Sequence, residues 1–224
     1  MWVKICANTN LHDAKLAADA GADAVGFVFA PSPRQVTAEH VATITRELPE
    51  KIKKIGVFDS RNFTEIAKAV RIAGLTGVQL HGGLDLPLAE RLRQEFGDEL
   101  FLMQTLHWLV DGNPAKTEEK FRMELCAVVR QNAVDAVLLD AKTATVSGGT
   151  GKNFNWAHAA EVLKANAGSL EIIIAGGLNA NNVAEAIRTL QPWGVDVASG
   201  TEASPGIKDP AKVKAFIASA RAHN

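Results

Sequence analysis

The 224-residue sequence predicts an α/β fold, a (β/α)8 barrel that forms one domain over residues 1–224. Two observations support this class. Short apolar runs rich in β-branched residues alternate along the whole chain with longer segments whose apolar residues recur every three or four positions. The short runs are almost continuously apolar, which is typical of parallel strands covered by helices. Eight repeats favour a closed barrel over an open doubly wound sheet, which would also alternate.

Each short run has the length and composition of a buried strand. Strands are expected at 2–6 (WVKIC), 24–29 (AVGFVF), 53–58 (KKIGVF), 76–81 (TGVQLH), 100–105 (LFLMQT), 135–140 (DAVLLD), 171–175 (EIIIA) and 194–199 (GVDVAS). The segments between them, such as FTEIAKAVRIAG and WAHAAEVLKANAG, have helical periodicity and often end on glycine, which favours a helix end. The looser stretch at 107–120 is predicted as a loop leading into the fifth helix.

Composition and charge narrow the class of protein. Hydrophobic residues make up 47% and charged residues 22% of the chain, and a formal net charge of -1 provides no basic field for nucleic acid. The chain contains neither a signal-peptide stretch nor the roughly 18 apolar residues of a membrane span. We expect a cytoplasmic monomer or homodimer without nucleic-acid or membrane partners. Its two cysteines fit neither a disulfide scaffold nor a zinc site, and Cys126 is expected in the core.

The active site of such a barrel lies at the carboxyl ends of the strands, so the residue that ends each run is a candidate. These residues are Cys6, Asp59, His81, Thr105 and Asp140. A polar residue at a strand end is also a common turn or helix cap, and we prefer that interpretation for Asp59 and Thr105. His81 is equally compatible with a structural role. Cys6 by itself is either a buried strand-tip residue or a reactive group.

Two glycine-rich stretches follow the last two predicted strands, AGGLNANN at 175–182 and ASGTEASPG at 198–206. In barrels these two loops commonly bind phosphate, because backbone N–H groups without side chains point at the anion. The pair therefore favours a sugar-phosphate ligand. A third cluster, SGGTGK at 147–152, is either a mobile flap or a plain turn, and it lacks the spacing of a Walker A loop.

Taken together, these motifs resemble the phosphoribosylanthranilate isomerase family over essentially the whole chain. The matching segments are VKIC, GADAVGFVFAPSPR, IGVF, VQLHG, LLDA, GGTGKNFNW, AGGLNANNVAEAI and GVDVASGTEASPGIKDP. The resemblance implies a TIM barrel of the ribulose-phosphate-binding type that acts in tryptophan biosynthesis. The implied reaction is the Amadori rearrangement of N-(5'-phosphoribosyl)anthranilate to 1-(2-carboxyphenylamino)-1-deoxyribulose 5-phosphate, without a cofactor or a metal ion.

The resemblance also implies the roles of individual residues. Cys6 would be the general base and Asp140 the general acid, and Arg34 would hold the anthranilate carboxylate. His81 is expected to contact the substrate. The phosphate-binding residues would be Gly176, Gly177, Ser199, Gly200 and Thr201.

The reaction gives independent reasons for these residue types. Opening the furanose ring requires a proton on the ring oxygen, and forming the enolamine requires removal of a proton from C2', so two groups must act from opposite sides. A thiol removes a proton only as the thiolate, so Cys6 needs an electropositive setting. Lys4 lies two residues back, about 6.6 Å along the strand, where it is either an influence on Cys6 or a filler of the barrel interior.

Four residues depart from the pattern of this family: Ala7 where glycine is usual, Asn155 for aspartate, Thr201 for an aliphatic residue and Asp59 for an apolar one. Asp59 is therefore also a candidate second acid that could affect Asp140. The alternative functions are another sugar-phosphate barrel enzyme and a barrel that only binds a phosphorylated ligand.

Overall fold

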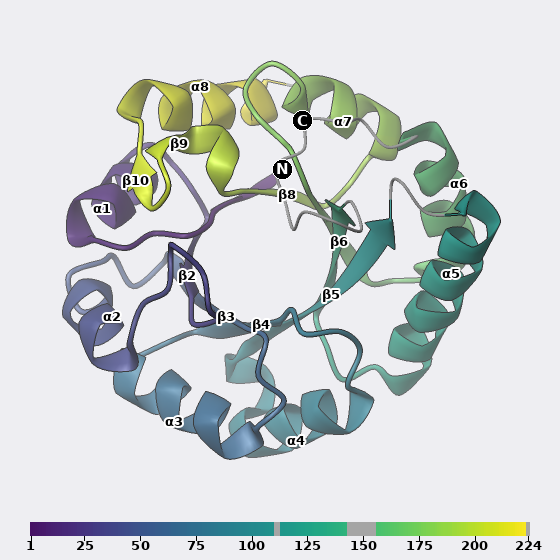
Figure 1. Cartoon of the computed structure of the whole chain (residues 1–224), viewed down its shortest axis with the longest axis horizontal. Coiled ribbons are helices and arrows are strands. Elements are labelled where there is room, and N and C mark those ends of the chain that lie inside the picture. The colour runs from purple at the N-terminus through teal and green to yellow at the C-terminus, as the bar shows by residue number, and fades with distance from the viewer. Residues whose placement is uncertain (110–112, 143–155, 223–224) are drawn as a thin grey trace.

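A computed structural model describes residues 1–109, 113–142 and 156–222 of the chain. Its parallel strands form a closed barrel at the centre of the molecule, and the helices surround it (Figure 1). The barrel confirms the predicted fold class. Its strands, each hydrogen-bonded to the next and β8 to β1, are β1 (Trp2–Ile5), β2 (Ala24–Val28), β3 (Lys53–Phe58), β4 (Gly77–Leu80), β5 (Phe101–Leu109), β6 (Ala136–Lys142), β7 (Glu171–Ala175) and β8 (Gly194–Val197).

A helix follows each strand and packs its apolar face on the outside of the barrel. These helices are α1 (Leu11–Asp19), α2 (Ala38–Thr45), α3 (Phe63–Ala73), α4 (Leu86–Phe96), α5 (Pro114–Gln131), α6 (Trp156–Asn166), α7 (Val183–Leu190) and α8 (Pro210–Arg221). Side chains cap several of them, as where Asn62 Oδ1 accepts from the N–H groups of Thr64 and Glu65 at the start of α3. None of the described helices is long and apolar enough to cross a membrane.

The connection between β8 and α8 carries short elements of its own. It contains a 3₁₀ turn at Ser199–Thr201 and a two-stranded hairpin of β9 (Glu202–Ser204) and β10 (Ile207–Lys208). This hairpin lies near α1 and α8 at the edge of the barrel (Figure 1). A charged or polar side chain of this segment can therefore reach the loops that follow β1 and β2.

The prediction for the fifth strand was wrong at its end. Residues 107–109, predicted as loop, continue β5, and His107 pairs in register with Asp140 of β6. Residues 114–120, also predicted as loop, are already helical, since α5 begins at Pro114. The ladder to β6 holds the strand together as far as Leu109, and Asn113 caps α5 by accepting from the N–H of Lys116.

A buried polar network crosses the inside of the barrel and distinguishes it from an all-apolar core. The ammonium Nζ of Lys4 donates to Gln79 Oε1 at 2.7 Å and to Asp196 Oδ1 at 3.0 Å. Gln79 Nε2 in turn donates to the hydroxyl of Thr105 at 3.0 Å. All four side chains are buried, so each depends on its partners to replace lost hydration. This network forms the floor beneath the carboxyl ends of the strands.

Candidate active site

A cavity of about 630 Å³ opens at the carboxyl ends of the strands. Its volume is in the range of small-molecule sites. The sequence-predicted residues that line it are Cys6, Arg34, Asp59, His81, Asp140, Gly176, Gly177 and Ser199. Barrel closure therefore brings together residues from both ends of the chain, as the strand-end argument expects.

Cys6 follows β1 and its thiol lies in a tightly fitted place. Its backbone N–H donates to the carbonyl of Val197 on β8 at 2.7 Å. A Cβ atom on Gly26 of the neighbouring strand would stand 2.6 Å from Cys6 Sγ, so only glycine leaves room for the thiol. The buried side chain of Lys4 fills the barrel interior, and its positive charge acts on this thiol. Both interpretations of Lys4 are therefore correct.

Burial raises the pKa of the Cys6 thiol, and the opposing positive charge of Lys4 does not cancel that effect. The buried Asp196 carboxylate raises the pKa further. For Lys4, burial alone would lower the pKa, but the charge of Asp196 outweighs it and the pKa is raised. Lys4 is thus a permanent cation beside a thiol that is mainly protonated near neutral pH.

Asp140 lies on β6, three strands from Cys6 around the eight-stranded barrel by way of β7 and β8, so the two groups approach the cavity from different sides. Its carboxylate Oδ2 is 3.6 Å from Nδ1 of His107 on β5. The ring of His107 meets that of His81 edge-on, with centroids 4.9 Å apart. The ligand atoms of His81, His107 and Asp140, all of types that bind divalent cations, lie within 4.8 Å of one another.

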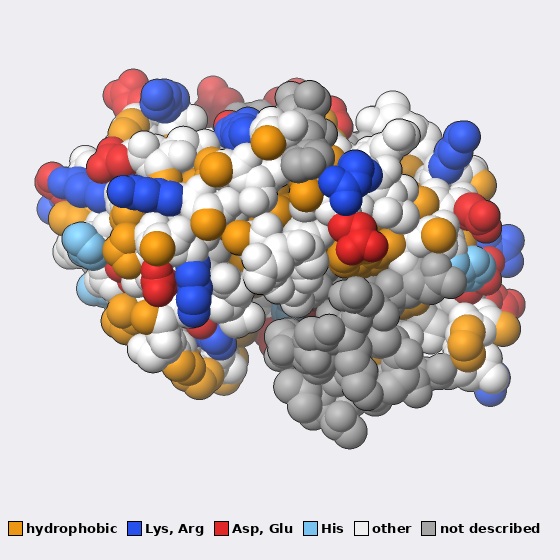
Figure 2. Space-filling model, turned by 90° about the horizontal axis from the view of Figure 1, so that it is seen from above, with side chains coloured by type: hydrophobic (Ala, Val, Ile, Leu, Met, Phe, Trp, Pro, Cys, Tyr) orange, Lys and Arg blue, Asp and Glu red, His pale blue; other side chains and the backbone are white. Residues whose placement is uncertain are grey.

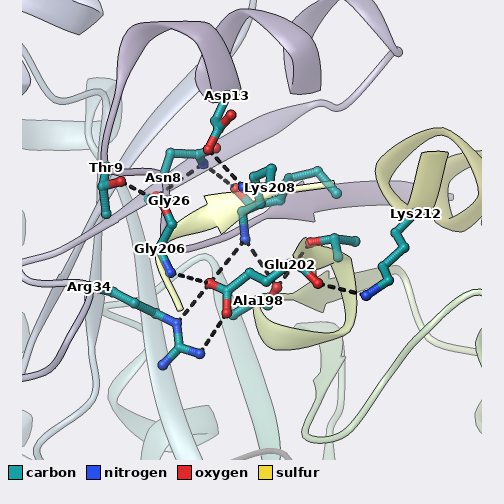
Figure 3. Close-up of polar contacts among 12 residues, drawn as sticks. Asn8, Thr9, Asp13, Gly26, Arg34, Ala198, Glu202, Gly206, Lys208 and Lys212 are labelled. Atoms are coloured by element: carbon teal, nitrogen blue, oxygen red, sulfur yellow. Dashed lines mark hydrogen bonds and ion pairs between the residues drawn. The ribbon is translucent and has the colours of Figure 1, made fainter. Parts of the chain in front are cut away.

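Arg34 is held by a carboxylate that the sequence interpretation missed. Its Nε and Nη2 donate to the two oxygens of Glu202 at 2.8 and 2.6 Å, a bidentate pair that fixes the plane of the guanidinium (Figure 3). Glu202 comes from the hairpin after β8 and its side chain is only 4% exposed. Arg34 itself lines the cavity. No sequence signal joins these two residues, which lie 168 positions apart.

Glu202 is the centre of a charged cluster at this side of the site (Figure 3). Its Oε1 lies 3.6 Å from the buried ammonium of Lys208, which also donates to the carbonyl of Ala198 at 3.0 Å. Burial would raise the pKa of Glu202, but hydrogen bonds from Arg34 and the charge of Lys208 outweigh it and the pKa is lowered. Burial lowers the pKa of Lys208 despite its carboxylate partner.

The two glycine-rich loops after β7 and β8 pack directly against each other and against β6. Gly176 has a φ of 88°, and a Cβ atom there would stand 2.6 Å from the backbone N and O of Ala141. A Cβ atom on Gly200 would stand 2.0 Å from the carbonyl oxygen of Leu178. Glycine is therefore a steric requirement at both positions.

Members of these loops differ in how they face the cavity. Gly176, Gly177 and Ser199 line it. Thr201 is fully buried, and both its N–H and its hydroxyl donate to the carbonyl of Ala198, at 3.3 and 3.0 Å. These two hydrogen bonds of Thr201 therefore stabilise the 3₁₀ turn that carries Ser199.

Two other candidates, Thr105 and Cys126, have different positions from those expected. Thr105 is not a cap, since its hydroxyl is buried inside the barrel and accepts from Gln79. Asp59 is exposed at the cavity mouth. Cys126 is a free thiol, as expected, but it is partly exposed beside Met123 at a shallow surface depression instead of in the core. The flap candidate at 147–152 and Asn155 lie outside the described residues.

His107 was missed because it stands in the stretch predicted as loop. Residues 105 and 107 of a strand point to the same face, and the Thr105 hydroxyl points into the barrel. With β5 extended to Leu109, the same alternation directs His107 toward the mouth. A prediction that placed the end of the fifth strand at Leu109 would therefore have identified His107 as a site residue.

Charge on the outer surface is mixed. On the face shown in Figure 2, Lys and Arg side chains alternate with Asp and Glu and do not gather into a basic field. This arrangement agrees with the small net charge of the chain.

Comparison with known proteins identifies the family. The model of N-(5'phosphoribosyl)anthranilate (PRA) isomerase matches residues 3–219. The N-(5'-phosphoribosyl)anthranilate isomerase of Pelobacter propionicus is 43% identical over 216 residues, which cover 96% of this chain and 93% of that protein.

Solved structures agree with this result. The crystal structure of phosphoribosyl anthranilate isomerase from Thermotoga maritima superposes with a TM-score of 0.84 at 33% identity and covers 99% of both chains. Another, of a phosphoribosyl anthranilate isomerase in complex with reduced 1-(o-carboxyphenylamino)-1-deoxyribulose 5-phosphate, has a TM-score of 0.80 at 30% identity over 99% of both chains. A match of this extent in sequence and in backbone leaves one conclusion: the chain belongs to the N-(5'-phosphoribosyl)anthranilate isomerase family.

Proposed function

We propose that the chain isomerises N-(5'-phosphoribosyl)anthranilate with Asp140 as the general acid and Cys6 as the general base. The family establishes an intramolecular aldose–ketose isomerase of tryptophan biosynthesis. The observation that supports these two roles is that a thiol from the first strand and a carboxylate from the sixth line one cavity from different sides. Two groups so placed can act on two atoms of a single sugar.

The first step would be ring opening. Asp140 in its acid form donates a proton to the furanose ring oxygen, the bond from C1' to that oxygen breaks, and the anilinic nitrogen supplies the electron pair to form an iminium ion. The Asp140 side chain is only 12% exposed, so little water competes for the proton. The ring oxygen therefore receives its proton from a side chain held next to it, and not from bulk water.

The second step would be proton removal from C2'. The iminium ion acidifies that C–H bond, and the Cys6 thiolate takes the proton to give an enolamine, which tautomerises to the ketose. A raised pKa makes the thiolate scarcer but a stronger base, and the adjacent Lys4 ammonium limits the cost of the negative charge. The substrate gains one proton at the ring oxygen and loses one at C2', so its overall number of protons is unchanged.

Recognition would use the two charged ends of the substrate. Arg34, with its guanidinium plane fixed by Glu202, faces the cavity and fits a planar carboxylate such as that of anthranilate. The backbone of Gly176, Gly177 and Ser199 fits the phosphate, because these residues line the cavity at the paired loops. Gly200 and Thr201 would support that loop from behind.

The test is steady-state turnover of freshly generated phosphoribosylanthranilate by the parent enzyme and by Cys6→Ala and Asp140→Asn. Each variant should lose about 10² or more in kcat, the size expected for a missing acid or base, while its circular dichroism stays that of the parent. Cys126→Ala removes the other free thiol and serves as the matched control with unchanged kcat. A Cys6→Ala variant that keeps parental kcat would remove Cys6 from the mechanism.

Two further expectations stay predictions. We place the enzyme in the cytoplasm, where a biosynthetic enzyme of this family would meet its substrate. A monomer or a homodimer is expected, and sedimentation of the pure protein distinguishes the two.

A further inference from the structure

Three neighbouring strands each place one metal-ligating side chain at the same edge of the cavity. His81 follows β4, His107 lies on β5 and Asp140 lies on β6. Their ligand atoms lie within 4.8 Å of one another. Two imidazoles and one carboxylate on adjacent strand ends are a donor set that suits zinc, cobalt, nickel and iron. The isomerisation uses only Asp140 of this group as acid.

The tautomer of His107 leaves a lone pair directed at Asp140. Its Nε2 lies 3.2 Å from the carbonyl oxygen of His81, and a carbonyl only accepts, so Nε2 carries the proton. In the neutral ring Nδ1 then holds a lone pair; this atom is buried and has no hydrogen-bond partner among the described residues. It stands 3.6 Å from the carboxylate Oδ2 of Asp140. Two electron-rich atoms at this separation favour a cation between them.

The same hydrogen bond is the one that orients histidine ligands in metal sites. A metal-bound imidazole usually donates its other N–H to a carbonyl or carboxylate, which fixes the ring and raises the basicity of the ligating nitrogen. His107 has this arrangement before any ion is bound. The site is therefore partly organised for a cation.

Distances among the ligand atoms suit a small divalent ion. Ligands bound at about 2.0–2.1 Å in tetrahedral geometry stand about 3.4 Å apart, close to the 3.6 Å between His107 and Asp140. The ring of His81, edge-on to that of His107, offers the third ligand atom, within 4.8 Å of the other two. The cavity that His81 and Asp140 line leaves room for water in a fourth position. The single carboxylate offsets one of the two positive charges.

We propose that His81, His107 and Asp140 bind one divalent transition-metal cation of the zinc type, and that the bound ion inhibits the isomerase by occupying the Asp140 carboxylate. Binding follows from the three side chains alone. Inhibition rests on the proposed role of Asp140 as the general acid, since a carboxylate bound to a metal ion cannot carry the proton. The imidazole nitrogens exclude magnesium and calcium as preferred occupants, because those ions prefer oxygen ligands.

Cobalt titration of the metal-free, full-length enzyme tests the site directly, because Co²⁺ reports its ligands by its absorption. We expect one equivalent of Co²⁺ with the visible bands of a four- or five-coordinate nitrogen and oxygen set, displaced by Zn²⁺. His107→Asn should weaken binding about tenfold or more, and His12→Asn, which changes an exposed histidine on α1, should not. His81→Asn is the second variant, should His107→Asn fail to fold. Absence of visible bands in excess Co²⁺, or a thiolate charge-transfer band that places the ion on Cys6, overturns the proposal.

Activity measurements separate the metal site from the proposed mechanism. Zn²⁺ should lower the kcat/KM of the parent, EDTA should restore it, and the residual activity of His107→Asn should be insensitive to Zn²⁺. Failure of cobalt binding together with an inactive Asp140→Asn would refute the metal site alone. Cobalt binding together with an active Asp140→Asn would refute the acid role and keep the site.

Discussion

Gly26→Ala should displace the Cys6 thiol without removing any polar side chain of the site. Gly26 lies in β2 beside Cys6, and its new methyl carbon would stand 2.6 Å from Sγ, 3.0 Å from Lys4 Cε and 3.1 Å from Cys6 Cα. The backbone Cα of Cys6 on the paired strand is one of these three atoms, so the methyl group cannot simply move away. The thiol must shift.

The size of the shift sets the size of the effect. Carbon and sulfur atoms in contact stand about 3.5–4.0 Å apart, so a thiol at 2.6 Å has to move by about 1 Å. A displacement of this size in a catalytic group costs about 10² in rate, or about 2.7 kcal/mol in the barrier. Overpacking should also lower the free energy of unfolding by about 1–3 kcal/mol.

The assay is kcat and KM for phosphoribosylanthranilate, measured with urea unfolding of the same preparation. Gly194→Ala is the matched control, because its methyl group would stand 2.9 Å from the Trp2 ring at the opposite end of the barrel. That variant should lose comparable stability and keep its kcat. A folded Gly26→Ala enzyme with kcat no lower than that of Gly194→Ala would refute the placement of Cys6 at the reacting carbon.

Three further outcomes follow from individual contacts. Because burial raises the pKa of Cys6, little thiolate is present at neutral pH, so in a Cys126→Ala background the rate of Cys6 alkylation by iodoacetamide should climb as the pH rises through about 8; an alkylation rate already level below about pH 8.5 contradicts this. Ala7 has a φ of 62°, and Ala7→Gly should relieve about 1–2 kcal/mol of strain against a cost of about 0.5–1 kcal/mol in chain entropy; urea unfolding should show a gain in stability of up to about 1.5 kcal/mol, not a loss. Glu202→Gln should raise KM about tenfold with a smaller change in kcat, because Arg34 loses its charged bidentate partner; unchanged KM would separate Arg34 from substrate binding.

Much of the candidate site was predictable because its residues sit at the ends of strands that the apolar pattern reveals. Cys6, His81 and Asp140 end predicted runs, and the paired glycines stand after the last two strands. His107 was not predicted, because the strand was predicted to end at 105, whereas β5 continues to Leu109. Glu202 could not be predicted, since neither a motif nor a periodicity marks a carboxylate in a hairpin.

The sequence by itself determined the order of strands and helices and the end of the barrel at which the site lies, because both follow from local periodicity and from the common direction of parallel strands. Only the tertiary structure decided which side chains pair with each other. Closure of β8 onto β1 brings Asp196 to Lys4, and the hairpin beyond β8 brings Glu202 to Arg34, across 192 and 168 positions. Such contacts determine charge and pKa at the site, and they depend on distances that local patterns along the chain do not encode.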